Sequence, residues 1–133
     1  MTDGSSRSTT RRAERASSRA ADGARAEAHA ARFLAGRGLT IVGRNFRTRM
    51  GEIDLIARDR EMLVFVEVRK RRTDAYGGAA ASITSAKQAR LVAAAQFYLA
   101  TLEREPPCRF DAVLIDGAVP PGIEWHRDVI ARD

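Results

Sequence analysis

The sequence predicts an α/β domain in which a mixed β-sheet is flanked by helices. In two segments apolar residues recur at intervals of three and four, which is typical of amphipathic helices. Other segments are short runs of strand-forming residues bounded by turn signals. The predicted order is helix, three strands, helix, then one or two strands. The long connection through the second helix allows the strand after it to lie parallel to its neighbour.

Length and composition limit the class of protein. The chain has 133 residues, 44% of them hydrophobic, which suggests one domain with a small core. A net charge of +6 favours nucleic acid or another anionic partner, although a generally Arg-rich proteome would explain the same charge. The single cysteine, Cys108, fits a reducing cytoplasm. Because no apolar run approaches the ~20 residues that span a bilayer, we expect a cytoplasmic protein without a membrane partner.

Residues 1–21 form a basic leader that we expect to be disordered and separate from a folded domain over residues 22–133. The leader has five arginines against two acids in a stretch rich in Ser, Thr and Ala. Such a composition contains too few apolar residues to form a core. Its arginines could still add non-specific contacts to phosphates.

Residues 22–37 are predicted to form the first helix, which Gly36 or Gly38 would end. Glu27 borders the apolar stripe of this helix, but an acid in a first turn is also favoured by the helix dipole alone. A strand over residues 39–46 follows, and Gly51 then suits a tight bend. Three arginines near this bend could hold phosphates, although such a cluster is also typical of a solvated edge: Arg44, Arg47 and Arg49.

Two runs of strand-forming residues, 52–57 and 62–68, flank a charged turn and predict a β-hairpin. Each run contains one acid among apolar residues, Asp54 in the first and Glu67 in the second. Burying an unpaired carboxylate is costly, so such acids need a cation or a function. A loop of two or four residues would place the acids on one face, diagonal to or directly opposite each other. A loop of three would place them on opposite faces.

In the favourable registers the two carboxylates would lie within roughly 5 Å of each other. A divalent cation would relieve their repulsion. Arg69 shares a face with Glu67, so the pattern predicts a site of oxygen ligands for Mg²⁺ or Mn²⁺ beside a basic residue. Lys70 would point to the opposite face unless a bulge turned it round.

Residues 73–86 form a glycine-containing connector that could close over nucleic acid or be an ordinary connection. The second helix is predicted over residues 83–102. Lys87 lies at the edge of its apolar stripe, so its ammonium could either extend towards the sheet or stay at the surface. Arg90 is a weaker candidate for a phosphate contact on the same helix.

The strand predicted over residues 109–115 is also interrupted by an acid, Asp111. This acid could be a metal ligand or a structural partner of Arg109. A short last strand is expected within residues 123–130, and its Trp125 is most simply a core residue.

From about Glu27 to its C-terminus the sequence resembles the YraN-like family of bacterial proteins, predicted nucleases of the restriction-endonuclease-like PD-(D/E)XK superfamily. The segments GEIDLIARD, MLVFVEVRKR and RFDAVLID, with a lysine before the last, are the basis of the resemblance. It implies a restriction-endonuclease-like three-layer fold, with Asp54 and Glu67 as metal ligands and Glu27 as an auxiliary acid. The family has a lysine where this chain has Arg69, and another that corresponds to Lys87.

Two functions of different classes follow from these residues. The first is a metal-dependent endonuclease of DNA, in which Arg69 and Lys87 stabilise the charge on the scissile phosphate. Arg69 stays protonated and cannot act as a base, which favours the second, a nucleic-acid-binding module without cleavage. An RNA- or ribosome-associated assembly factor is a third. DNA is expected over RNA, and a homodimer would suit a branched substrate. The side chains expected to contact nucleic acid are Arg44, Arg47, Arg49, Lys70, Lys87 and Arg90.

Overall fold

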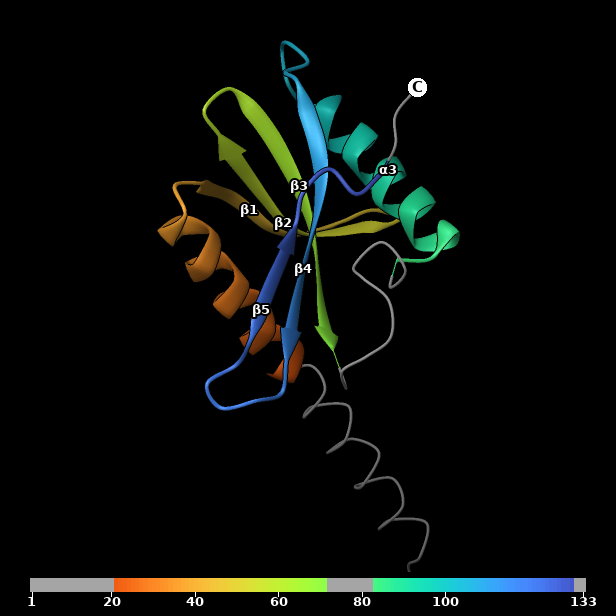
Figure 1. The fold of residues 1–133 in the computed structure, drawn as a ribbon. Coiled ribbons are helices and arrows are strands. Elements are labelled where there is room, and N and C mark those ends of the chain that lie inside the picture. Colours follow the sequence, from red (N-terminus) through yellow and green to blue (C-terminus); the bar gives the residue numbers. More distant parts are fainter. Residues whose placement is uncertain (1–20, 72–82, 131–133) are drawn as a thin grey trace, which may run out of the picture.

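The computed structural model of the chain describes residues 21–71 and 83–130. These residues form a sheet with a helix on each side, one over residues 21–36 and the other α3 (Figure 1). The predicted α/β fold with a mixed sheet flanked by helices is confirmed. Residues 1–20 of the predicted leader and residues 73–82 of the predicted connector lie outside the described residues. The labelled elements are β1 (Thr40–Arg47), β2 (Glu52–Asp59), β3 (Met62–Arg71), α3 (Ser85–Leu99), β4 (Cys108–Asp116) and β5 (Ile123–His126).

The five strands lie in the order β1-β2-β3-β4-β5. Neighbours are antiparallel except β3 and β4, which run parallel from Leu63 of β3 and Cys108 of β4 to the ends of both strands. A parallel neighbour requires a long crossover, and α3 lies within that crossover. The predicted parallel strand after the second helix is therefore confirmed.

The β2–β3 hairpin has the register that brings the two predicted acids together. Asp59 pairs with Met62, so the loop has two residues rather than three. Arg60, the first loop residue, has φ of 60°, as primed two-residue turns require. The register runs on without a shift along the hairpin. Asp54 therefore lies directly opposite Glu67 on one face of the sheet.

Each face of the sheet packs against one helix. Val64 and Val66 of β3 point towards the helix over residues 21–36 and pack in a core with its Leu34. Phe65, between them, points the other way and packs with Leu91 of α3. The alternation of strand side chains thus divides β3 between two cores. Among the described residues no helix has the length and apolar character needed to cross a membrane.

The second helix is shorter than predicted at both ends. Thr84 is extended, with ψ of 161°, and its side chain accepts a hydrogen bond from the backbone N–H of Lys87, so the helix begins only at residue 85. Leu102, predicted within the apolar stripe, lies beyond the last helical turn and is 36% exposed. The first helix ends before Gly38, whose φ of 97° is the left-handed conformation that closes many helices.

Candidate acidic site

Asp54 and Glu67 form a hydrogen-bonded pair of carboxyl groups between β2 and β3. Burial raises the pKa of Asp54 from 3.8 to about 8, and the charge of Glu67 and the hydrogen bond to it act in the same direction. The backbone N–H of Val68 donates a hydrogen bond of 2.8 Å to Asp54 Oδ2, which lowers the pKa but does not reverse the shift. The surroundings of Asp54 therefore favour its protonated form.

The Asp54 carboxyl group lies where the backbone ladder between β2 and β3 stops. The last register pair of the hairpin is Leu55 with Val66. Just beyond it, the N–H of Val68 donates a hydrogen bond to the Asp54 side chain. A backbone donor in a buried sheet needs an acceptor. The acid thus stabilises the open end of the hairpin through Val68 and also contacts Glu67.

A small cavity of about 90 Å³ extends from Glu67 towards α3. It has room for a few water molecules. Glu67 and Glu52 come from the hairpin, whereas the opposite wall is the N-terminal half of α3. Two of the cations predicted for this site, Lys87 and Arg90, line the cavity and face the acids. Residues far apart in the sequence are thus brought together around one opening.

Gly51 fixes the distance between the hairpin and α3. A Cβ atom built on this glycine would lie 2.0 Å from the carbonyl oxygen of Arg90. Real side chains do not approach a backbone oxygen this closely, so only glycine permits the contact. The sequence predicts a bend at Gly51, but the close approach of its backbone to Arg90 depends on how α3 docks.

Arg69 lies two residues after Glu67 on β3, so its side chain leaves the same face of the sheet. Its Nη1 atom is buried and has no hydrogen-bond partner in the part of the chain that the structure describes. Leaving a buried charged donor unpaired costs free energy. An anionic group bound beside Glu67 would satisfy this donor.

Glu27 lies beside the acid pair rather than within it. Burial raises its pKa, and a side-chain hydrogen bond with Asn45 and the charge of Arg47 act against that rise. Asn45 has φ of 52°, a conformation that asparagine tolerates better than most residues. The influence of Glu27 on Asp54 is the weakest of the causes that shift the latter's pKa. Its role as an auxiliary metal ligand stays a prediction.

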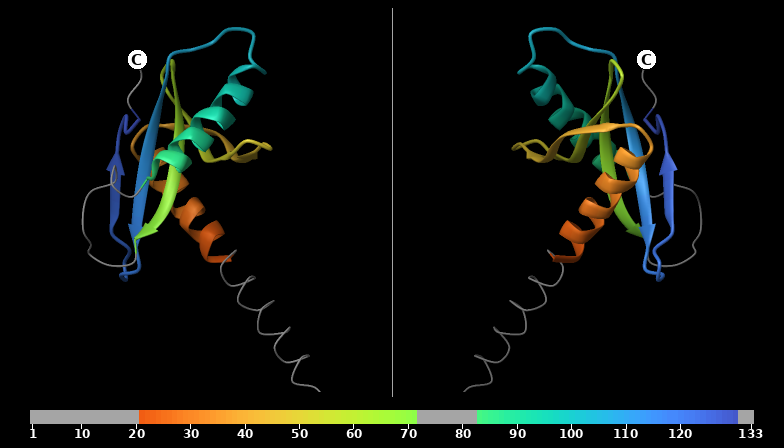
Figure 2. Two further views of the ribbon diagram at one scale, coloured as in Figure 1. Left: turned by 90° about the vertical axis from the view of Figure 1, so that its right-hand side faces the viewer. Right: turned by 90° about the vertical axis from the view of Figure 1, so that its left-hand side faces the viewer.

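The three arginines of the β1–β2 hairpin are exposed. Arg44 and Arg47 lie on β1, and Arg49 lies in the turn that follows. Arg47 forms an ion pair of 3.6 Å with Glu52, but both side chains are more than half exposed, so the pair adds little stability. Figure 2 shows this hairpin projecting sideways from the body of the sheet. The predicted cluster is therefore available to a partner.

Lys70 lies on the other side of the sheet from the acid pair. Its Nζ atom is 3.5 Å from Asp22, in the helix over residues 21–36. Together with His29 and Arg32 it lines a separate groove of about 420 Å³. No bulge turns β3, because its register with β4 is unshifted. Lys70 thus points away from Glu67, because side chains alternate between the two faces along β3.

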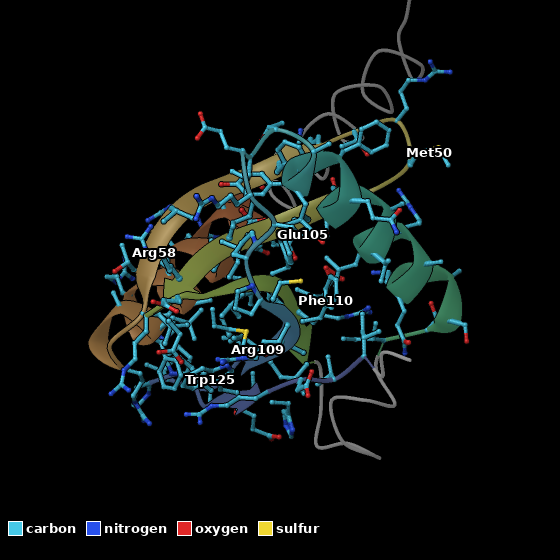
Figure 3. All side chains as sticks on the ribbon, turned by 90° about the horizontal axis from the view of Figure 1, so that it is seen from above. Met50, Arg58, Glu105, Arg109, Phe110 and Trp125 are labelled. Atoms are coloured by element: carbon cyan, nitrogen blue, oxygen red, sulfur yellow. The ribbon has the colours of Figure 1, made fainter. Side chains whose placement is uncertain are left out.

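Asp111 is a structural partner rather than a ligand. Its side chain is fully buried and accepts hydrogen bonds from Arg109 Nε (3.0 Å), Trp125 Nε1 (3.0 Å) and the backbone N–H of Asp128 (2.9 Å). Figure 3 shows Arg109 and Trp125 on the same side of the molecule, away from α3. Both carboxylate oxygens are therefore in use. Of the two roles open to Asp111, the geometry selects the one with Arg109.

Two residues near the site were not predicted from the sequence as site residues. Glu52 lines the cavity with Glu67, and its position two residues before Asp54 on a strand was a usable signal. Asn45 contacts Glu27, but nothing in its sequence neighbourhood indicated this. Among the described residues no group of three or more His, Cys, Asp or Glu side chains is arranged around a common centre.

The fold and the site define an α/β protein with a carboxyl pair at the edge of a hairpin, faced by cations from the neighbouring helix. The model of the Uncharacterised protein family UPF0102 matches residues 26–115. A UPF0102 protein of Nitrosomonas europaea is 56% identical over 106 residues, which cover 80% of this chain and 90% of that protein. One of Ralstonia pickettii is 53% identical over 119 residues, 86% of this chain and 93% of that protein. This chain belongs to the UPF0102 family, the YraN-like family that its motifs predict.

Proposed function

We propose that this protein is a metal-dependent endonuclease-like protein that binds DNA and hydrolyses its phosphodiester bonds. The main support is the position of Glu67. It pairs with Asp54 on one side and lines a cavity with Lys87 and Arg90 on the other. Paired carboxyl groups suit a divalent cation, and the facing cations suit the phosphate that such a cation would bind. The resemblance to the PD-(D/E)XK superfamily supports the same function.

The acid pair fits Mg²⁺ or Mn²⁺. Mg²⁺ commonly uses only one or two carboxylates and completes its shell with waters and substrate phosphates, so a third protein acid is not required. Asp54 and Glu67 would hold the cation, which when bound would act as a Lewis acid and lower the pKa of a bound water. Asp54 would release its proton on binding, because carboxyl groups ligate metals in the ionised form.

The cations around the pair would act on the phosphate. The unpaired Nη1 of Arg69 would donate to a phosphate oxygen beside Glu67, and Lys87 would stabilise negative charge from the α3 side. Arg69 cannot accept a proton. Lys87 is therefore the candidate to replace the lysine that the superfamily has at position 69.

A second function, a nucleic-acid-binding module without cleavage, is favoured by one observation. Arg69 stands where a lysine would orient the attacking water, and a guanidinium can bind phosphate without performing that step. Both proposals place DNA before RNA. Both also place the protein in the cytoplasm, where the single cysteine of the chain would stay reduced.

The test is cleavage of labelled duplex, single-stranded and branched DNA with Mg²⁺ or Mn²⁺. We expect Asp54→Asn and Glu67→Gln each to lower the rate by about 100-fold or more, since they remove ligands of a Lewis acid worth several kcal/mol. Glu61→Gln, an exposed acid at the far end of the same hairpin, is the matched control. Binding without cleavage that is equal in all variants would establish the second function instead.

Arg69→Lys separates the two functions further. Increased cleavage would mean that the guanidinium limits the reaction. A further loss would mean that Arg69 has its own adapted role. In either case binding should weaken steeply with salt, because phosphate contacts release counterions.

A further inference from the structure

Met50 is an exposed apolar side chain at the tip of the β1–β2 hairpin. It is 58% exposed, more than any other large apolar residue of the described chain except Val119. Figure 3 shows it at the outermost point of the hairpin, beside α3 and clear of the sheet. No core residue covers it, so its position has no explanation in the packing of the described domain.

The turn that presents Met50 is held rigidly. Thr48 Oγ1 accepts hydrogen bonds from the backbone N–H groups of Met50 (3.1 Å) and Gly51 (3.0 Å) and donates one to the Gly51 carbonyl (2.9 Å). The N–H of Thr48 donates to the same carbonyl at 2.8 Å. A tip fixed in this way loses little conformational freedom when it binds a partner.

The surroundings of Met50 are cationic. Arg49 precedes it and forms no ion pair within the described part of the chain, and Arg44 and Arg47 lie on the strand that leads to the turn. Glu52, through its exposed pair with Arg47, and Glu27 offset part of this charge. The arginines of this narrow hairpin are complementary to the phosphate groups of a nucleic acid. The apolar side chain between them is complementary to the base stack.

The tip is also linked to the acid pair by packing contacts. Gly51, next to Met50, lies against the Arg90 carbonyl, and Arg90 lines the cavity with Glu67. A nucleic acid bound by the tip would therefore pass close to the site proposed for phosphate binding.

We propose that Met50 is a wedge that inserts between neighbouring base pairs of duplex DNA from the minor groove, while the arginines of the hairpin contact the flanking phosphates. Apolar side chains that enter a base step in this way partly unstack it and bend the duplex. This inference rests on the proposed function and adds a substrate class, stacked duplex DNA that is deformed on binding.

The test uses duplex DNA with 2-aminopurine at pyrimidine–purine steps, which unstack most easily. Its fluorescence rises when the base is unstacked. EDTA prevents cleavage, and anisotropy of a second label measures binding in the same samples. We expect the wild type to raise the fluorescence and Met50→Ala to abolish that rise, with affinity about tenfold weaker, equivalent to about 1.4 kcal/mol. Phe97→Ala, which removes a side chain 51% exposed on α3, should behave like the wild type.

Met50→Lys separates insertion from charge. It should bind duplex DNA at least as tightly as Met50→Ala, through one more phosphate contact, yet give no rise in fluorescence. Because Met50 is exposed, neither substitution should affect folding, and circular dichroism checks this.

Each result distinguishes this inference from the proposed function. Binding by the wild type without a fluorescence rise, or an equal rise with Met50→Ala, would overturn the wedge and leave the nuclease proposal intact. A rise without metal-dependent cleavage would support the wedge and favour a binding module. Absence of binding to any DNA would overturn both. If sedimentation instead shows self-association that Met50→Lys abolishes, with unchanged fluorescence, Met50 is a protein contact and the wedge is wrong.

Discussion

Asp54 and Asp111 both interrupt apolar strands, but their surroundings differ. Asp111 lies at 0% exposure among three donors, one of them the guanidinium of Arg109. Asp54 receives one backbone hydrogen bond and faces another carboxyl group. The buried Asp111 is satisfied by its donors, whereas the half-buried Asp54 beside another acid costs free energy unless a proton or a cation is present.

The difference indicates which of the two acids is structural. Asp111 links β4 to β5, because Trp125 and the backbone of Asp128 both bind it. Asp54 stabilises the end of a hairpin at some electrostatic cost, and such a cost is typical of functional sites. Removing each acid should therefore have opposite effects on stability.

The largest effect should be the pH dependence caused by Asp54. Its pKa is about 8 in the folded protein against 3.8 otherwise, so between these values the unfolded chain releases a proton that the folded protein keeps. The contribution of Asp54 to stability should consequently be complete at and below about pH 4, fall as the pH rises towards 8, and then level off. Each unit of the pKa difference corresponds to about 1.4 kcal/mol, so the free energy of unfolding could change by at most about 6 kcal/mol across this pH range. Water that enters the site would reduce this change.

Urea unfolding of the wild type and Asp54→Asn from pH 5 to pH 8.5 measures this effect. Asparagine has no proton to release, so the variant should gain stability relative to the wild type as the pH rises. Glu61→Gln controls for a change of charge at an exposed position. Parallel curves for wild type and Asp54→Asn would mean that the acid pair does not retain a proton.

Asp111→Ala should have the next largest effect. It should lower the stability of the protein, whereas Asp54→Asn should raise it. Asp111→Ala leaves the charged side chain of Arg109 and the indole of Trp125 without their acceptor, and breaking a buried ion pair in this way costs about 3–5 kcal/mol. Denaturant unfolding followed by the fluorescence of Trp125, the one tryptophan of the chain, measures the loss. A stable Asp111→Ala protein that has lost metal-dependent cleavage would instead identify Asp111 as a ligand.

Local rules narrowed the geometry of the acid pair, and the loop length of the folded hairpin selected one arrangement. Strand alternation and loop parity limited Asp54 and Glu67 to a few arrangements, and the structure has one of them. Alternation also correctly directed Lys70 away from Glu67. Both results depend on neighbours in one hairpin, where the sequence determines the geometry.

The features that the sequence could not predict depend on packing between elements that are distant in the chain. Two of the three donors to Asp111 come from residues 14 and 17 positions later in the chain, so the choice between its two roles required the position of β5. The approach of Lys87 to Glu67 depends on the docking of α3 against the hairpin. The sequence indicates the face of each element but not the distance between elements.

Gly51→Ala should have the smallest effect on stability but a specific effect on the acid pair. The added Cβ would lie 2.0 Å from the Arg90 carbonyl oxygen and 2.6 Å from its carbon, so the hairpin and α3 must separate. Backbone shifts of this kind cost about 1–3 kcal/mol. Because Lys87 and Arg90 would move away from Glu67, DNA binding and cleavage should fall by more than the lost stability explains. The Trp125 fluorescence of the folded protein, which reports on the Asp111 side, should stay unchanged.

Gly36→Ala is the matched control, since nothing lies within 4 Å of a Cβ built there, and in a helix alanine should be neutral or slightly stabilising. If Gly51→Ala binds DNA like the wild type, the contact with Arg90 does not position the cations. If it also shifts the Trp125 fluorescence, the two acids do not lie in independent parts of the fold. If only binding and cleavage fall, the acid pair depends on the packing of α3, and Asp111 depends on its own hydrogen bonds.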